Sequence, residues 1–118
     1  MHYSTDITAT ATSSGLQIAG AMHPTAAVGG TPRDVALRMI GEAEEHSRCR
    51  YAAPVGWMDD RGNADWALAL RCAHITGEAT ARAYAGGGLV AGSTPAVEIA
   101  EVSAKFSAIL AGFGTTSL

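Results

Sequence analysis

Three predicted strands of this chain carry apolar side chains on both of their faces. In residues 51–58, 66–75 and 79–90, each of the two alternating sets of positions contains apolar residues. Such strands are typical of sheets that protein covers on both sides. Turn residues at 59–63 and 76–78 separate the three strands, which predicts an antiparallel meander.

The composition leaves little polar surface to face solvent. Of the 118 residues, 47% are apolar and 16% are charged, whereas ordinary domains have roughly 25% charged residues. A chain of this length buries only about two-thirds of its unfolded surface. We therefore expect one domain at most, and more specifically part of a larger domain whose other parts cover these strands.

Charge and cysteine content exclude several classes of function. The net charge is −3 and no basic run exceeds two residues, which argues against nucleic acid and anionic membrane as partners. The apolar stretches are shorter than the ~20 residues of a spanning helix, and no export signal opens the chain. Cys49 and Cys72 are isolated, which predicts buried thiols in a reduced, cytoplasmic protein.

Helices flank the three strands in the predicted order. Residues 1–12 are rich in Thr and predict a further strand, 16–22 predict a short helix, and 23–32 predict a loop. Thr31 with Pro32, and Thr94 with Pro95, are typical helix starts, so we expect helices from there to 45–47 and to about 111. The order β-α-α-β-β-β-α indicates the α+β class, with antiparallel strands and flanking helices.

The last predicted helix carries the strongest local signal. Glu98, Glu101 and Lys105 follow one another at spacings that place them on one stripe of the helix. Two carboxylates spaced in this way can serve a hard cation such as Mg²⁺, which prefers oxygen ligands. The alternative is a solvated helix face with an ion pair between Glu101 and Lys105.

Two further features indicate an anion site. Gly86, Gly87 and Gly88 let backbone N–H groups approach an anion closely, although a bend or bulge explains a glycine run equally well. Arg71 is a lone charge within an apolar strand, so we expect it to meet either an acidic side chain or a bound anion. Tyr51 begins the preceding strand, and its hydroxyl can donate to the same anion.

Four segments, taken in chain order, resemble the chorismate-binding enzymes, and isochorismate synthases in particular. HPTAAVGGTPR at 23–33 is similar to the family's H-P-T-P-A-x-G-G-x-P, and LALRCA at 68–73 is similar to its T-I-R-C-A strand. The strand from 51 and its turn at 62–63 resemble the family's next segment. AGGGLV at 85–90 with Ser93, Pro95, Glu98, Glu101 and Lys105 resembles A-G-A-G-I-V followed by S-x-P and E-x-x-E-x-x-x-K. Ala26 and Gly87 stand where the family commonly has Pro and Ala.

The resemblance implies a partial chorismate-binding fold, like that of anthranilate synthase component I, and a role for each matched residue. It implies that Glu101, supported by Glu98, ligates Mg²⁺, and that Ala27 marks members in which water is the nucleophile. His2 would correspond to a family histidine near the substrate ring. The residues that would hold the carboxylates of chorismate are Tyr51, Arg71, Gly86, Gly87, Gly88 and Lys105.

The family's catalytic domain is much longer, so the resemblance implies that residues 1–118 are its C-terminal part. The general base and general acid would then lie upstream, and this part alone would be inactive. The parent activity expected is conversion of chorismate to isochorismate, for menaquinone or siderophore synthesis. The alternatives are a non-catalytic truncated chain or interaction piece, or part of an anthranilate, aminodeoxychorismate or salicylate synthase. The expected protein partner is a complementary N-terminal half or a second copy.

Overall fold

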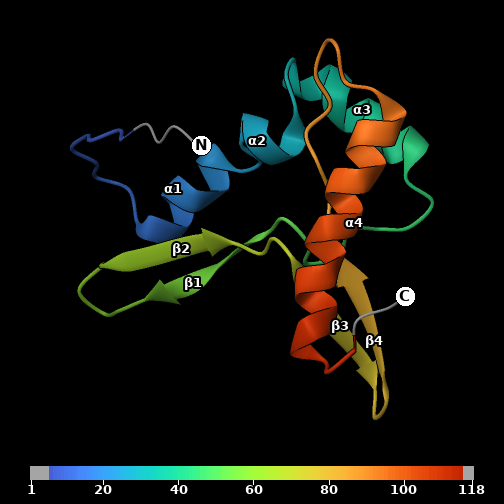
Figure 1. Cartoon of the computed structure of the whole chain (residues 1–118). Coiled ribbons are helices and arrows are strands. Elements are labelled where there is room, and N and C mark those ends of the chain that lie inside the picture. The colour runs from blue at the N-terminus through green and yellow to red at the C-terminus, as the bar shows by residue number, and fades with distance from the viewer. Residues whose placement is uncertain (1–5, 116–118) are drawn as a thin grey trace.

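The first three elements and the last element of the described chain are helices, and two β-hairpins lie between them (Figure 1). The computed structural model describes residues 6–115. Its elements, in chain order, are α1 (Gly15–Met22), α2 (Ala26–Gly29), α3 (Arg33–Ala43), β1 (Pro54–Met58), β2 (Ala64–Leu68), β3 (Cys72–Gly77), β4 (Thr80–Tyr84) and α4 (Pro95–Gly112). This mixture of helices and antiparallel strand pairs confirms the α+β class.

The first hairpin pairs β1 with β2, with Pro54 opposite Leu68 and Met58 opposite Ala64. The side chain of Asp59 organises its turn, because one carboxylate oxygen accepts hydrogen bonds of 2.9 and 2.8 Å from the backbone N–H groups of Arg61 and Asn63. The other accepts a 2.7 Å bond from the amide side chain of Asn63. These bonds, led by the one from the Asn63 side chain, lower the pKa of Asp59. The predicted turn at 59–63 is confirmed.

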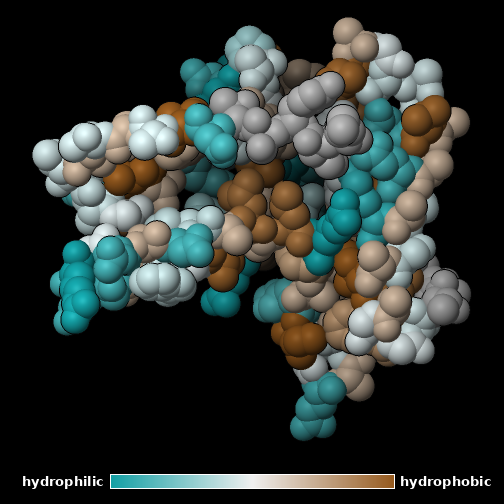
Figure 2. All heavy atoms as spheres, turned by 60° about the vertical axis from the view of Figure 1, so that its left-hand side comes forward, coloured by the Kyte–Doolittle hydropathy of each residue, from teal (hydrophilic) through white to brown (hydrophobic). Residues whose placement is uncertain are grey.

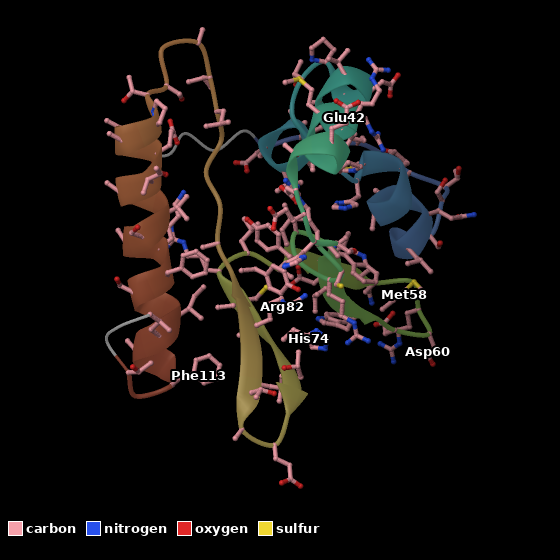
Figure 3. The ribbon with its side chains drawn as sticks, turned by 90° about the vertical axis from the view of Figure 1, so that its right-hand side faces the viewer. Glu42, Met58, Asp60, His74, Arg82 and Phe113 are labelled. Atoms are coloured by element: carbon pink, nitrogen blue, oxygen red, sulfur yellow. The ribbon has the colours of Figure 1, made fainter. Side chains whose placement is uncertain are left out.

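The second hairpin pairs β3 with β4 in a separate sheet, with Cys72 opposite Tyr84 and His74 opposite Arg82 (Figure 3). The single strand predicted over 66–75 is therefore wrong. Arg71 has a φ of +48°, a left-handed conformation that an extended strand does not contain, so the chain turns between β2 and β3. The strand predicted to reach residue 90 ends at Tyr84, because the glycines that follow favour irregular backbone.

The helix starts follow the sequence, with two corrections to the predicted caps. Ser14 caps α1 in a capping box with Gln17. Thr94 precedes Pro95 at the start of α4 as predicted, but its side chain makes no capping hydrogen bond. At α3, however, Pro32 itself is the cap residue and no side chain caps the helix. Residues 6–12 form no strand, since an isolated strand is unstable without a partner; the rest of that predicted strand, residues 1–5, lies outside the described residues.

Little of the described chain is buried. Gly29, Ala52 and Ile109 are the buried residues among 6–115. The accessible surface of 9452 Å² exceeds the about 6,000 Å² of a compact protein of this mass. The radius of gyration of 16.6 Å likewise exceeds the about 13.5 Å of a compact chain of this length. The elements are formed, but they do not enclose a core of their own.

Large apolar side chains therefore lie on the surface, and brown hydrophobic atoms are visible over much of it (Figure 2). Trp57 of the first hairpin is 56% exposed, and Ile75 of the second is 62% exposed. Val97 and Ile99 extend this apolar surface along α4. The prediction that both thiols are buried is wrong for Cys49, which is exposed, while Cys72 is half-buried. None of the described helices has both the length and the apolar content that crossing a bilayer requires.

Candidate functional site

The site predicted from sequence is centred on α4 and on the irregular segment that joins β4 to it. This segment turns back at 91–94 and runs alongside α4, as the views from two sides show (Figures 1 and 3). Phe113, at the other end of the helix, lies on the side that faces the β3–β4 hairpin (Figure 3). The glycines of the joining segment are thereby brought beside the charged stripe of α4.

Lys105 joins the two parts of the site. Its ammonium donates a 2.9 Å hydrogen bond to the carbonyl oxygen of Gly86 and a 2.5 Å bond to the carboxylate of Glu101. The side chain of Lys105 is 20% exposed and that of Glu101 is 53% exposed. An ammonium has three donors, so one N–H remains available for an anionic ligand. The ion pair considered for Glu101 and Lys105 is present.

Glu98 lies two turns before Lys105 on the same helix and faces the next glycine, Gly87. Its Oε1 accepts a 2.5 Å hydrogen bond from the hydroxyl of Ser93, and that hydroxyl also accepts a 3.1 Å bond from the backbone N–H of Val90. A Cβ added to Gly87 would lie 3.2 Å from Glu98 Oε2. Ser93 thus orients the carboxylate toward the glycine segment, a role that its place in a helix-start motif did not indicate.

Tyr51 approaches the same segment from the loop before β1. A Cβ added to Gly86 would lie only 2.7 Å from the hydroxyl oxygen of Tyr51, so the close approach requires glycine. The ring of Tyr51 stacks on that of Tyr84, with 5.5 Å between centroids and 14° between planes. Tyr51, Gly86 and Lys105 therefore form a continuous row.

Four other predicted site residues lie apart from this row. Arg71 is exposed at the break between β2 and β3, and among the described residues it has no recorded hydrogen bond or ion pair. Around Gly88 an added Cβ would meet no atom within 4 Å. Ala27 is exposed on α2. His2 lies outside the described residues.

Arg48 is a contact residue that the sequence reasoning missed. Its guanidinium donates three hydrogen bonds, of 2.6, 2.9 and 3.1 Å, to the carboxylate of Glu44. It also donates a 3.0 Å bond to the carbonyl oxygen of Val28 and lies 5.8 Å from the ring centroid of Tyr51. Hydrogen bonding to Glu44 raises the pKa of Arg48, and the same bonds lower the pKa of Glu44. The i,i+4 spacing of Glu44 and Arg48 is the sequence signal that points to this pair.

A cavity of 480 Å³ adjoins the site, and Arg48, Tyr51, Arg82, Tyr84 and Phe106 are among its lining residues. It shares Tyr51 with the row of site residues, but Glu98, Glu101 and Lys105 do not line it. The row is therefore only partly in contact with the cavity, and Tyr51, Glu98 and Lys105 are half-buried. The hydroxyl of Tyr84 is buried without a hydrogen-bond partner among the described residues.

A family model described as "Chorismate binding enzyme" matches residues 1–114. The chain belongs to the chorismate binding enzyme family. The family resemblance read from four sequence segments is confirmed.

Several curated chorismate binding enzymes are similar to this member. It is 46% identical over 99 residues to the isochorismate synthase DhbC of Bacillus subtilis, covering 84% of this chain and 25% of that protein. It is 44% identical over 110 residues to the salicylate biosynthesis isochorismate synthase of Pseudomonas aeruginosa, covering 92% of this chain and 23% of that protein. The vibriobactin-specific isochorismate synthase of Vibrio cholerae is 43% identical over 99 residues, covering 84% of this chain and 25% of that protein. The chain thus spans about a quarter of the length of these relatives.

The donors present on α4 suit a hard divalent cation as part of its shell. Glu98 and Glu101 offer carboxylate oxygens from one helix face, the ligand type that Mg²⁺ takes. Within residues 6–115, however, no group of three or more His, Cys, Asp or Glu side chains is placed to hold a metal. The two carboxylates therefore fit two positions of such a shell, and the remaining positions require water, substrate or other protein groups.

Proposed function

We propose that this chain forms one wall of the chorismate site of an isochorismate synthase. The reaction is an isomerisation in which water adds to the chorismate ring and a hydroxyl group is lost. Membership of the chorismate binding enzyme family supports the substrate class, and the names of three similar relatives support the reaction. Because the chain spans about a quarter of those relatives, the activity belongs to a larger assembly that contains this wall.

The observation that carries the proposal is the row formed by Tyr51, Gly86 and Lys105 beside Glu98 and Glu101. Chorismate is a dianion, so its site needs cationic and N–H donors next to a bound cation. The 2.9 Å bond from Lys105 to Gly86 ties a donor side chain to the glycine segment. On the same helix, the carboxylate of Glu101 accepts a 2.5 Å bond from Lys105, and the carboxylate of Glu98 lies directly against the glycine segment.

Each residue of the wall has a distinct part in this proposal. Glu101 and Glu98 hold Mg²⁺, which neutralises negative charge on the bound substrate. Lys105 and the hydroxyl of Tyr51 donate to substrate carboxylates, with the backbone N–H groups of Gly86, Gly87 and Gly88. Arg71 adds a further cation if the break between β2 and β3 turns it toward the substrate in the complete assembly. His2 remains a candidate near the substrate ring.

Ala27 is the proposed specificity residue. Its methyl group leaves room for a water molecule and brings no hydroxyl that competes for the same position. The water must also meet a general base, and the departing hydroxyl a general acid, within hydrogen-bond reach. We assign both of these groups to protein outside this wall, so that the 118-residue chain alone does not turn over chorismate.

The proposal is tested by grafting the chain onto a complete relative. The matching segment of DhbC, which is 46% identical over 99 residues, is replaced by the corresponding residues of this chain. We expect the chimaera to convert chorismate to isochorismate with Mg²⁺, as followed by product chromatography, and the isolated chain to give no product. The chimaera carrying Glu101→Gln is the control and should lose activity. A folded chimaera that neither binds nor converts chorismate would contradict the proposal.

A further inference from the structure

Arg48 lies in the loop between α3 and β1. Its contacts with Glu44, Val28 and Tyr51 form a junction between three segments of the chain. Glu44 is the C-cap residue of α3 and lies four residues before Arg48. The Nε and Nη2 groups of Arg48 donate to the two carboxylate oxygens of Glu44, at 2.9 and 2.6 Å. This paired geometry fixes the plane of the guanidinium. The side chain of Arg48 is 30% exposed and that of Glu44 is 40% exposed, so the pair is partly shielded from solvent.

The fixed guanidinium reaches two other segments. Its Nη1 donates a 3.0 Å hydrogen bond to the carbonyl oxygen of Val28, twenty residues earlier in the chain and one residue after Ala27. Its Cζ lies 5.8 Å from the centroid of the Tyr51 ring, a distance typical of a cation–π contact. One side chain therefore touches both α2 and Tyr51.

Among the described residues, the α2 segment receives one side-chain hydrogen bond, from Arg48, and its Gly29 is buried. It is a helix of four residues with no side-chain cap, and a helix this short is not stable alone. Its contacts are with α3, from whose end Glu44 and Arg48 extend. Because α2 carries Ala27, Arg48 links the segment of Ala27 to Tyr51.

We propose that Arg48 is a positioning residue, oriented by Glu44, that holds the Ala27 segment at a fixed distance from Tyr51. The placement of Arg48 in a chorismate site rests on the proposed function, whereas its hydrogen bond to α2 is observed in the structure. Lysine cannot replace arginine here, because it has neither a planar fork for Glu44 nor a flat face for the Tyr51 ring. The substitutions Arg48→Gln, Arg48→Lys and Glu44→Gln therefore remove different parts of the junction.

The first experiment needs no substrate. Hydrogen–deuterium exchange is measured on the DhbC chimaera, without chorismate, for amides at 26–30, with Arg38→Gln as the matched control, since Arg38 is an exposed arginine of α3. We expect Arg48→Gln to speed exchange at 26–30 at least fivefold, Glu44→Gln to have a smaller effect, and Arg38→Gln to stay within twofold. Unchanged exchange at 26–30 in Arg48→Gln would overturn the proposal. If that variant exchanges fast throughout, Arg48→Lys and Glu44→Gln supply the same comparison.

The second experiment uses the DhbC chimaera and reports on positioning rather than on folding. Arg48→Gln should raise KM for chorismate at least fivefold while Arg38→Gln leaves it within twofold. Ala27→Thr should change KM at least threefold less in the Arg48→Gln background than in the unsubstituted chimaera. The two effects are not additive because both substitutions act on the distance between the Ala27 segment and Tyr51. Additive effects would overturn the positioning role. If the unsubstituted chimaera is inactive and binds no chorismate, the proposed function fails, and the exchange experiment alone decides whether Arg48 holds α2.

Discussion

Lys105 on α4 donates a 2.9 Å hydrogen bond to the carbonyl oxygen of Gly86, nineteen residues earlier in the chain. The bond connects the helix that carries the acidic residues with the segment that carries the glycines. It is exposed, and so is the accompanying pair with Glu101. An exposed contact of this kind contributes little to folding, so we expect Lys105 to matter more for ligand binding than for stability.

The first prediction concerns Lys105→Gln. The change removes a charged donor from the proposed site, so chorismate affinity should fall at least tenfold, as expected for a hydrogen bond to a charged group. The free energy of unfolding should change by less than about 1 kcal/mol, because the pair is exposed. Isothermal titration and urea unfolding of the DhbC chimaera measure the two quantities, with Arg38→Gln as the charge control. A loss of stability without a loss of affinity would contradict the prediction.

Gly87→Ala should be tolerated and mildly stabilising. The added methyl would lie 3.2 Å from Oε2 of Glu98, the end of a side chain that can move by the few tenths of an ångström required. Alanine also restricts the unfolded chain, which stabilises by about 0.4–1 kcal/mol where the native backbone accepts it. Thermal unfolding of the DhbC chimaera is the measurement. A lowered midpoint would show that Ser93 holds Glu98 too rigidly to adjust.

The neighbouring substitution, Gly86→Ala, should have the opposite sign. Its methyl would lie 2.7 Å from the hydroxyl oxygen of Tyr51, so the ring or the segment must move. Tyr51→Phe removes that oxygen, and the next nearest atom, Tyr51 Cζ, would be at 3.8 Å. The thermal midpoint should therefore fall for Gly86→Ala and recover in the double variant. Equal losses in both backgrounds would mean that the two residues do not meet.

Acidification should weaken the junction at Glu44. Its pKa is lowered in the folded state, first by hydrogen bonding to Arg48, so the folded state binds fewer protons than the unfolded state around the ordinary value of 4.5. The stabilisation is present above that value and is lost as the pH falls through the lowered pKa. Urea unfolding of the DhbC chimaera between neutral pH and pH 3 should show a steeper loss of unfolding free energy for the unsubstituted chimaera than for its Glu44→Gln variant. Glu42→Gln, a change on exposed α3, should retain the steep profile.

The open apolar surface predicts association of the isolated chain. Trp57, 56% exposed on the first hairpin, would gain from burial against any complementary surface. Light scattering coupled to gel filtration should detect oligomers or aggregates at micromolar concentration, and Trp57→Ser should shift the distribution toward monomer. A monodisperse monomer with a cooperative thermal transition would contradict this prediction.

Local sequence signals predicted the elements that local interactions determine. The turn at 59–63 forms around Asp59, whose side chain binds residues two and four positions later. The end of α4 and the pairing of Glu101 with Lys105 likewise depend on neighbours within one or two turns. Such features can be predicted from residue spacing, because the interacting residues lie within a few positions of one another in the sequence.

Other features depend on segments that are distant in the sequence. The left-handed backbone at Arg71 divides one expected strand into two sheets, and no local motif announces it. Arg48 donates a hydrogen bond to Val28, twenty residues earlier in the chain. Ser93, which the sequence placed in a helix start, donates a hydrogen bond to Glu98. The row from Tyr51 to Lys105 could be inferred only through resemblance to a family.

Both sheets of this structure are single hairpins, each closed by a turn of a few residues. Hairpins form within about 1–10 μs, because no distant segment has to be found first. Covering their apolar faces is a different kind of event, in which two preformed surfaces must collide in the correct orientation. When the surfaces belong to separate chains, the rate of that step scales with concentration, whereas within one chain it depends on the tether. In the proposed assembly, productive docking would therefore compete kinetically with self-association, after the secondary structure is complete.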